Sequence, residues 1–194
     1  MSRSFVLDGH NYDYCMGRHN AAWRNERTIE VPIGLRFVHE NEGRILEVGD
    51  VLSYYAPTSH IVVDWGGKKN ERPIRCDIVE FDAEPFDAIL SISTMEHIWK
   101  ENGAKFLRAF DNVKRLLKPG GTMLVTMPLA WQPGLDELLV AGRVEFTRCL
   151  RMARADKANN WVQVEWPGEF IPYGKFQPGA ASDVFIGIYT KAPN

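Results

Sequence analysis

The sequence predicts an α/β protein built on a mostly parallel sheet, and three observations support this fold class. Short, nearly continuous apolar runs recur between residues 45 and 127, as expected for strands that are buried on both faces. Acidic, glycine or small polar residues follow these runs, and they would lie at the carboxyl edge of a parallel sheet. Loops and helical patterns separate the runs, which is the alternation that parallel sheets require.

A helix is expected before the first strand. Ile29, Ile33 and Phe37 recur at four-residue spacing, which is typical of one helix face. The helix would span about residues 26–39. Its regular part would begin at Pro32, because proline fits the first turn of a helix.

Five strands and the main helix follow. The expected strands are residues 45–48, 61–64, 73–76, 88–93 and 122–127. Between the last two, residues 103–117 form a helical pattern whose apolar stripe is Leu107, Phe110, Val113 and Leu117. Pro119-Gly120-Gly121 would end this helix. The remaining expected elements are a short helix at 135–140 and later strands at 147–154, 161–166 and 184–190.

The composition favours a soluble globular protein over nucleic-acid-binding and membrane-spanning classes. The 194 residues are 45% hydrophobic and 25% charged, which suits one soluble domain. The formal net charge of −2 gives no sign of a basic surface for binding nucleic acid. The sequence contains no run of 18 apolar residues, so no membrane span is expected. The three cysteines are far apart without a CxxC motif, which favours reduced thiols and a cytoplasmic location. The histidines and acids lack metal-ligand spacing, so no metal is expected.

Two of the expected strands end in an acidic residue that could contact a bound ligand. Glu47-Val48-Gly49 ends the first strand, and the glycine permits a sharp turn with positive φ. Asp64 ends the second strand, where a carboxylate can accept hydrogen bonds from the ribose hydroxyls of an adenosine. Trp65 follows it and could shape an adenine pocket. An ordinary β-to-α turn and a solvated carboxylate are the alternative interpretations.

The fourth strand ends in a second polar segment, Ser91-Ile92-Ser93-Thr94-Met95-Glu96-His97-Ile98. His97 is a candidate general base, because the pKa of an imidazole can readily be tuned toward neutral pH. Glu96 is the candidate residue that orients it. Alternatively, both residues merely cap the following helix.

Together these motifs resemble the class I S-adenosylmethionine-dependent methyltransferases over about residues 20–190. The family pattern of an acid followed by three alternating glycines falls on Glu47, Gly49, Val51 and Ser53, so only the first glycine is present and Ser53 is a small substitute. The resemblance implies a Rossmann-like sheet that ends with an antiparallel C-terminal strand and carries helices on both faces.

The resemblance also implies roles for particular residues. S-adenosyl-L-methionine would be held by Glu47, Gly49, Ser53, Asp64, Trp65, Asp77, Ile78 and Ser93. Of these, Asp77 falls where a family carboxylate contacts the adenine amino group, and Ile78 would pack on the ring. His97 would be the base and Glu96 its orienting partner.

The N-terminal segment and the loop after the first strand resemble a bacterial subgroup with an EVGxVLSxY loop in place of the glycine-rich loop. Members of this subgroup are associated with sugar and surface-glycan biosynthesis. Residues 1–25 would be an arm or lid on a single domain at residues 26–194. Trp23 and Arg27 would bind the substrate from the arm, or simply anchor it.

The expected activity is methyl transfer to a hydroxyl or amine of a small molecule, such as a glycan precursor. Three other classes stay open. A catalytically degenerate binding module would use the same sheet, and the missing glycines favour it. A nicotinamide-dependent oxidoreductase would need the second and third dinucleotide glycines, which the segment after Gly49 lacks. A structural partner subunit is the third. The sequence does not predict an oligomeric state.

Overall fold

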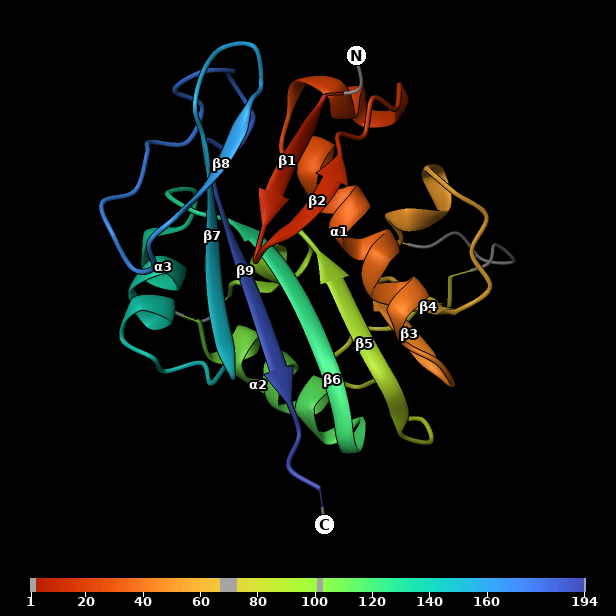
Figure 1. Cartoon of the computed structure of the whole chain (residues 1–194). Helices are drawn as coiled ribbons and strands as arrows, with labels where there is room; N and C mark the ends of the chain where they lie inside the picture. The colour runs from red at the N-terminus through yellow and green to blue at the C-terminus, as the bar shows by residue number, and fades with distance from the viewer. Residues whose placement is uncertain (1–2, 67–72, 101–102, 194) are drawn as a thin grey trace.

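A seven-stranded sheet forms the centre of the molecule, and a two-stranded hairpin precedes it in the chain (Figure 1). The computed structural model describes residues 3–66, 73–100 and 103–193. The elements in chain order are β1 (Ser4–Leu7), β2 (His10–Asp13), η1 (His19–Arg24), α1 (Arg27–Glu40), β3 (Ile45–Val48), η2 (Leu52–Tyr54), β4 (Ile61–Val63), β5 (Phe86–Ile92), η3 (Met95–Ile98), α2 (Ala104–Arg115), β6 (Leu117–Pro128), α3 (Pro133–Val140), β7 (Arg148–Arg154), β8 (Trp161–Val164) and β9 (Asp183–Thr190). The strands of the large sheet lie in the order β4-β3-β5-β6-β9-β7-β8.

One half of the sheet is parallel and the other is antiparallel. β3 pairs parallel with β4 and β5, and β5 pairs parallel with β6. β9 runs antiparallel to both β6 and β7, and β8 runs antiparallel to β7. The predicted fold class is therefore confirmed, including the first strand at residues 45–48 and the antiparallel strand near residues 184–190. All four residues of β3 are buried, Glu47 among them, as expected for a strand covered on both faces.

The strand predicted at residues 73–76 is wrong. Within the described residues, this segment meets the sheet at one isolated bridge, between Val63 and Ile74. Pro73 has no amide hydrogen to donate to a ladder, and the Ile74 side chain is 47% exposed. A single pair of backbone hydrogen bonds therefore joins the segment to β4 without extending the sheet.

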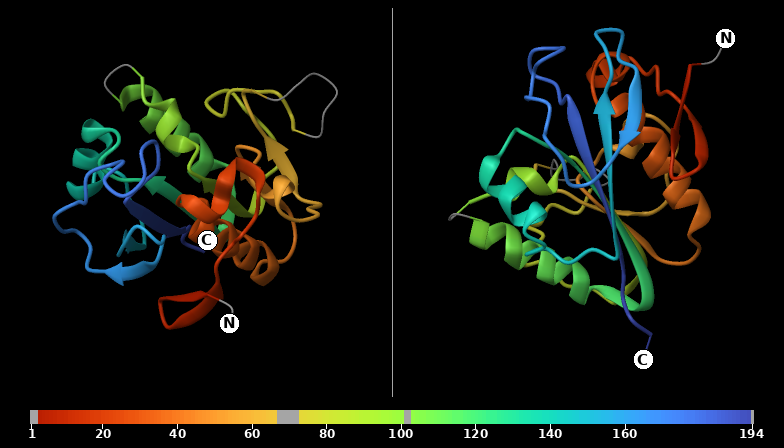
Figure 2. Two further views of the ribbon diagram at one scale, coloured as in Figure 1. Left: turned by 90° about the horizontal axis from the view of Figure 1, so that it is seen from above. Right: turned by 60° about the vertical axis from the view of Figure 1, so that its left-hand side comes forward.

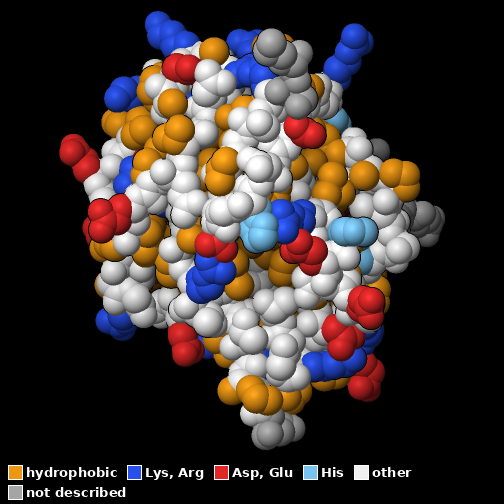
Figure 3. All heavy atoms as spheres, viewed as in Figure 1, with side chains coloured by type: hydrophobic (Ala, Val, Ile, Leu, Met, Phe, Trp, Pro, Cys, Tyr) orange, Lys and Arg blue, Asp and Glu red, His pale blue; other side chains and the backbone are white. Residues whose placement is uncertain are grey.

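Helices cover both faces of the sheet. Figure 2 shows α2 and α3 on one face, and α1 with the β1–β2 hairpin on the other. α1 approaches β5 closely at Gly34, where an added Cβ would lie 2.5 Å from the Ile92 side chain. On the face seen in Figure 3, basic and acidic side chains are interspersed. Among the described helices, none is long and apolar enough to cross a membrane.

The helix predicted at about residues 26–39 is α1, but its regular part does not begin at Pro32. Regular helix begins at Arg27, so Pro32 lies inside the helix and not at its first turn. Pro32 cannot donate to the carbonyl of Thr28. The backbone amide of Cys15 donates to that carbonyl instead, over 2.8 Å. A contact with the preceding segment thus satisfies the group that the proline leaves free.

The buried stripe of α2 contains Phe110 and Val113, as predicted, but it has Phe106 in place of Leu107, and Leu117 lies in β6 and not in the helix. Phe106, Ala109, Phe110 and Val113 are buried, whereas Leu107 is only half-buried. The helix ends at Arg115, so Pro119-Gly120-Gly121 does not end it. These three residues lie in β6, whose Gly120 and Gly121 exchange backbone hydrogen bonds with Lys191.

Asp136 gives a pH-dependent test of the packing around α3. Its Oδ2 accepts a hydrogen bond from the Ala130 amide, and its Oδ1 has no partner among the described residues. Burial raises the pKa of Asp136 from 3.8 to about 6. The folded state therefore binds more protons than the unfolded state between these values, and stability falls as pH rises through this window.

We expect Asp136→Asn to stabilise the protein at pH 8 by about 1–2 kcal/mol, because the uncharged amide removes the cost of burying a charge, reduced by partial solvent screening. The gain should vanish below about pH 4, where the wild-type carboxyl is protonated in both states. Urea unfolding at the two pH values measures it. Asp82→Asn is the control, since that side chain is 80% exposed. A gain that does not change with pH would contradict the account.

Candidate active site at the carboxyl edge of the parallel strands

The loops that follow β3, β4 and β5 meet at one edge of the sheet, because parallel strands end on the same side. A cavity of about 390 Å³ opens there. Its lining residues are Val48, Gly49, Val63, Asp64, Trp65, Gly66, Cys76, Asp77, Ile78, Thr94, His97, Ile98, Lys100 and Lys105. Of the predicted site residues, it gathers Gly49, Asp64, Trp65, Asp77, Ile78 and His97.

Glu47 lies behind the cavity and shapes the loop after β3. The side chain is fully buried, and its Oε1 accepts the backbone amides of Val51 at 3.0 Å and Leu52 at 2.9 Å. Its Oε2 lies 2.7 Å from His60 Nε2. These bonds hold the loop where the family pattern would have glycines. Ser53 also stabilises the loop, because its hydroxyl donates a hydrogen bond to the Asp50 side chain. Ser53 does not line the cavity.

Gly49 brings the loop against the end of β5. Its φ is +89°, and an added Cβ would lie 2.2 Å from Thr94 Oγ1. A side chain at this position would therefore meet both backbone strain and a clash. The side chain of Val51 packs against the core on the α1 face of the sheet and is not among the residues that line the cavity.

Asp64 faces the cavity from the end of β4. Its Oδ2 accepts the Asp50 amide at 3.0 Å, and its Oδ1 accepts the Gly66 amide at 2.6 Å. The carboxylate is thus fixed by two loops and keeps further acceptor positions. Trp65 is 71% exposed beside it, and the Lys105 ammonium lies 5.9 Å from the centre of the Trp65 ring.

Asp77 and Ile78 also line the cavity. Burial alone would raise the pKa of Asp77, but hydrogen bonds from Lys105 and from the Val79 amide outweigh it, so the pKa is lowered. Asp77 is therefore ionised at neutral pH. Sequence reasoning missed Lys105, because nothing in the sequence distinguished it from other surface lysines of a helix.

His97 stands at the cavity with its side chain 64% exposed. Burial, and to a lesser extent the charge of Arg27, lower the pKa of His97 below 6.5, so the ring is neutral at pH 7. The Trp131 ring meets it edge-on, with ring centres 4.9 Å apart. His97 Nε2 lies 3.8 Å from Glu96 Oε1, which is an ion-pair distance rather than a hydrogen bond.

Ser93 and Arg27 do not line the main cavity. Both belong to a buried network centred on Glu30, which accepts hydrogen bonds from Ser93 Oγ, Thr126 Oγ1 and Arg27. Ser93 has a φ of +36°, which is an uncommon conformation for a residue with a side chain. Arg27 lines a separate cavity of about 120 Å³ on the α1 side of the loop after β3.

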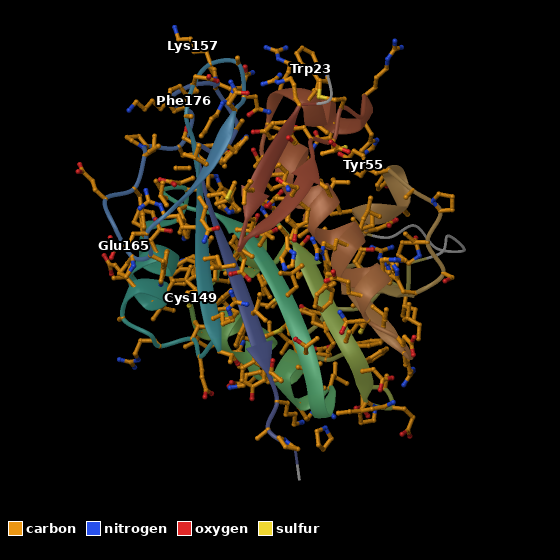
Figure 4. All side chains as sticks on the ribbon, viewed as in Figure 1. Trp23, Tyr55, Cys149, Lys157, Glu165 and Phe176 are labelled. Atoms are coloured by element: carbon orange, nitrogen blue, oxygen red, sulfur yellow. The ribbon has the colours of Figure 1, made fainter. Side chains whose placement is uncertain are left out.

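Trp23 lies apart from both cavities. Figure 4 shows it at the upper edge of the molecule, away from Tyr55 on the loop after β3. Its side chain is 46% exposed, and the Arg24 guanidinium lies 5.2 Å from its ring centre. The Trp23 carbonyl accepts a hydrogen bond from Asn159. In this structure Trp23 therefore contacts the β7–β8 connection and not the cavity.

The arrangement suits a nucleoside with a reactive group beside His97. The fixed carboxylates of Asp64 and Asp77 can accept hydrogen bonds from hydroxyl and amino groups, and apolar walls at Val48, Val63 and Ile78 can cover a ring. A neutral imidazole at the rim can accept a proton. Within the described residues, no three His, Cys, Asp or Glu side chains form a group that could hold a metal ion.

Comparisons with known proteins agree with this geometry. Residues 58–125 match a family model described as a methyltransferase domain. The chain is similar to the structure of the [4+2]-cyclase SpnF, at 16% identity, 100% coverage of this chain, 87% of that chain and a TM-score of 0.55. It is also similar to the N-methyltransferase NodS from Bradyrhizobium japonicum WM9 in complex with S-adenosyl-L-homocysteine, at 15% identity, 82% and 83% coverage and a TM-score of 0.51. No curated protein matches the sequence. At these identities the two structures establish the shared fold.

Proposed function

We propose that the chain is an S-adenosylmethionine-dependent methyltransferase that acts on a hydroxyl or amine of a small molecule. The observation that carries this proposal is the cavity that joins the Gly49 turn, Asp64 and Asp77 with a neutral His97. The segment matched by the methyltransferase family model contains Asp64, Asp77 and His97.

The residues present fit the cofactor. Asp64 would accept the ribose hydroxyls, since its carboxylate is already held in place by backbone amides. Trp65 and Ile78 would pack on the adenine ring, and Asp77 would accept a hydrogen bond from the adenine amino group. Glu47 and Ser53 would act indirectly by holding the loop that carries Gly49. Ser93 would act in the same way at the end of β5.

For methyl transfer the protein needs mainly to align the acceptor with the methyl group and to remove a proton from the acceptor. When bound, the cofactor supplies a methyl group on a positively charged sulfur. The cavity walls would align the acceptor with it, and such alignment can supply much of the rate enhancement. His97 Nε2 would take the acceptor's proton, and Glu96 would orient and stabilise the resulting imidazolium from 3.8 Å away.

The finer parts of the proposal concern the acceptor and its access. Residues 1–25 would act as an arm over the domain at residues 26–194. Arg27 would face the acceptor from the smaller cavity, and Trp23 would reach it only by moving from its present contacts. The subgroup resemblance supports a sugar or glycan precursor as the acceptor, and the scattered cysteines favour a cytoplasmic location.

A non-catalytic binding module is the second candidate, and the substitution of Val51 and Ser53 for glycines favours it. Such a module would bind the cofactor or its product without turnover. The packing of Val51 against the core, away from the main cavity, weakens the case that this substitution blocks binding.

Replacing Asp64 by Ala tests the proposed cofactor site. We expect the affinity for S-adenosylmethionine to fall by about 1.5–3 kcal/mol, the value of hydrogen bonds to a charged group. Calorimetric titration measures it. Asp82→Ala is the matched control, because this exposed acid lies outside the cavity. Equal affinities for wild type and a folded Asp64→Ala variant would count against the site.

A further inference from the structure

Lys105 lies in the main cavity beside the residues that would meet the adenine ring. Its ammonium donates a hydrogen bond to Asp77 Oδ2, in an ion pair of 2.5 Å. The same ammonium lies 5.9 Å from the centre of the Trp65 ring. All three residues, together with Ile78, line the cavity of about 390 Å³. A basic side chain therefore lies where the base of a nucleoside would be recognised.

The start of α2 fixes the backbone of Lys105. The next residue, Phe106, is fully buried, and its ring centre lies 6.2 Å from those of Trp99 and Phe110. Gly103 precedes the helix with a φ of +89°, and an added Cβ there would lie 2.7 Å from the Trp99 ring. The residues on both sides of Lys105 are thus closely packed, which limits the positions that its ammonium can reach.

A further contact ties α2 to the segment that carries Asp77. Asn112 Nδ2 donates hydrogen bonds to the carbonyl of Ile78, over 2.7 Å, and to the carbonyl of Phe81, over 2.8 Å. Lys105 and Asp77 therefore belong to two segments that are held together independently of their own ion pair. Because of this contact, the donor and the acceptor keep a fixed spacing at the cavity.

Both members of the ion pair are able to bond a ligand as well. An ammonium has three hydrogens, and the bond to Asp77 uses one of them. A carboxylate can accept about four hydrogen bonds, and those from Lys105 and the Val79 amide are two of them. These two bonds outweigh burial and lower the pKa of Asp77, so its carboxylate is ionised at neutral pH and can only accept. A ligand thus meets a donor and an acceptor side by side.

We propose that Lys105 and Asp77 together recognise one edge of the adenine base of S-adenosylmethionine. Asp77 accepts a hydrogen bond from the amino group, and Lys105 donates one to a ring nitrogen beside it, either N1 or N7. This inference rests on the proposed methyltransferase function. Lys105 is then a specificity-determining residue of the cofactor site, and not only the counter-ion of an acid.

The edge of adenine carries the matching groups. Its amino group is a donor, and the neighbouring ring nitrogens N1 and N7 are acceptors, one on each side of it. Packing on Trp65 and Ile78 covers the faces of a base and does not distinguish a ring nitrogen from a C–H group. A charged donor does distinguish them, because its hydrogen bond is about twice as strong as a neutral one and a C–H group cannot accept it.

Analogues of S-adenosylhomocysteine test the inference on the full chain. In two deaza analogues a C–H group replaces N1 or N7, and in a third analogue a hydrogen replaces the amino group. Calorimetric titration at neutral pH compares them with S-adenosylhomocysteine. We expect at least one deaza analogue to bind wild type about 10-fold more weakly or worse, the lower end for losing a hydrogen bond to a charged group. The analogue without the amino group should also bind more weakly.

Lys105→Met removes the ammonium and keeps an unbranched apolar side chain that suits a helix. This variant should bind S-adenosylhomocysteine about 10-fold more weakly than wild type, and it should no longer distinguish that ligand from the deaza analogue that wild type binds poorly. The analogue without the amino group should still bind less tightly, because Asp77 remains. Lys118→Met is the matched control, since Lys118 forms an ion pair with Asp87 over 2.8 Å outside the cavity. It should behave as wild type with every ligand.

The outcomes separate the two proposals. If wild type binds both deaza analogues as tightly as S-adenosylhomocysteine, Lys105 does not recognise the base and the inference is wrong. This comparison needs no variant, so it does not depend on the folding of Lys105→Met. Full discrimination by a folded Lys105→Met would overturn the inference as well. Failure of wild type to bind S-adenosylhomocysteine would instead overturn the proposed methyltransferase function.

Discussion

Replacing His97 by Asn is expected to lower kcat by about 10²–10⁴-fold, the usual contribution of a general base, while the affinity for S-adenosylmethionine changes little. The imidazole stands at the cavity, and asparagine fills similar space but cannot accept a proton. Because burial and Arg27 lower the pKa of His97 below 6.5, wild-type kcat should stay constant from pH 7 to 8 and fall only in more acidic solution. Release of S-adenosylhomocysteine with an amine or alcohol acceptor measures the rate.

His39→Asn is the matched control for this variant, since His39 is exposed in the last turn of α1 and lies outside the cavity. It should retain the wild-type rate and pH profile. If His97→Asn also keeps full turnover across the pH range, His97 is only structural and methyl transfer depends on alignment alone.

Replacing Asp183 by Ala is expected to destabilise the folded protein by about 3–5 kcal/mol, because it leaves a buried charge unpaired. Both side chains of the Arg151–Asp183 pair are buried, with 6% and 0% exposure. Asp183 accepts Arg151 Nε at 2.8 Å, a second Arg151 nitrogen at 2.7 Å and the Ile171 amide. The loss should also loosen the segment between β8 and β9, which Ile171 joins to this pair. Urea unfolding measures the change.

Two controls separate the buried charge from the general effect of a substitution. The double change Arg151→Met with Asp183→Leu removes both charges, so it should recover most of the stability lost by Asp183→Ala. In the exposed pair Arg115–Asp82, with 55% and 80% exposure, Asp82→Ala should cost only about 0–1 kcal/mol. Equal losses in the buried and exposed pairs would contradict the account.

The parallel strands could be predicted from the sequence because strands buried on both faces have nearly continuous apolar runs. The run at residues 45–48 is β3 without any change of boundary. Residues 73–76 fail this rule, because an apolar residue beside Pro73 can meet an edge strand at one bridge without forming a ladder. The place of Pro32 inside the regular part of α1 could not be predicted either. The partner of the carbonyl freed by Pro32 is Cys15, and this tertiary contact leaves no local signal.

The sequence predicted the position of the candidate site better than it predicted the contacts of the individual site residues. Asp64 follows β4, so it had to lie at the carboxyl edge of the parallel strands, whereas Asp77 lines the cavity from a segment that is not a strand. The spacing of Glu47 could not show that its carboxylate binds the amides of Val51 and Leu52, since the glycine pattern predicts ligand contact there. Adjacent residues also differ in environment: His97 is exposed at the cavity, while Glu96 is buried and one of its oxygens has no hydrogen-bond partner among the described residues. That difference depends on the backbone of η3 and on the helix packed behind it.

Calorimetric titration of the wild-type chain with S-adenosylmethionine and S-adenosylhomocysteine tests the central claim most directly. The account predicts that both ligands bind at one site per chain with Kd between about 1 μM and 1 mM, the usual range of substrate affinities. Binding should change the fluorescence of Trp65, which is 71% exposed at the cavity, and Trp65→Phe should remove that change. The absence of binding heat for both ligands, from a chain whose circular dichroism shows it to be folded, would contradict the claim that this cavity is a methyltransferase site.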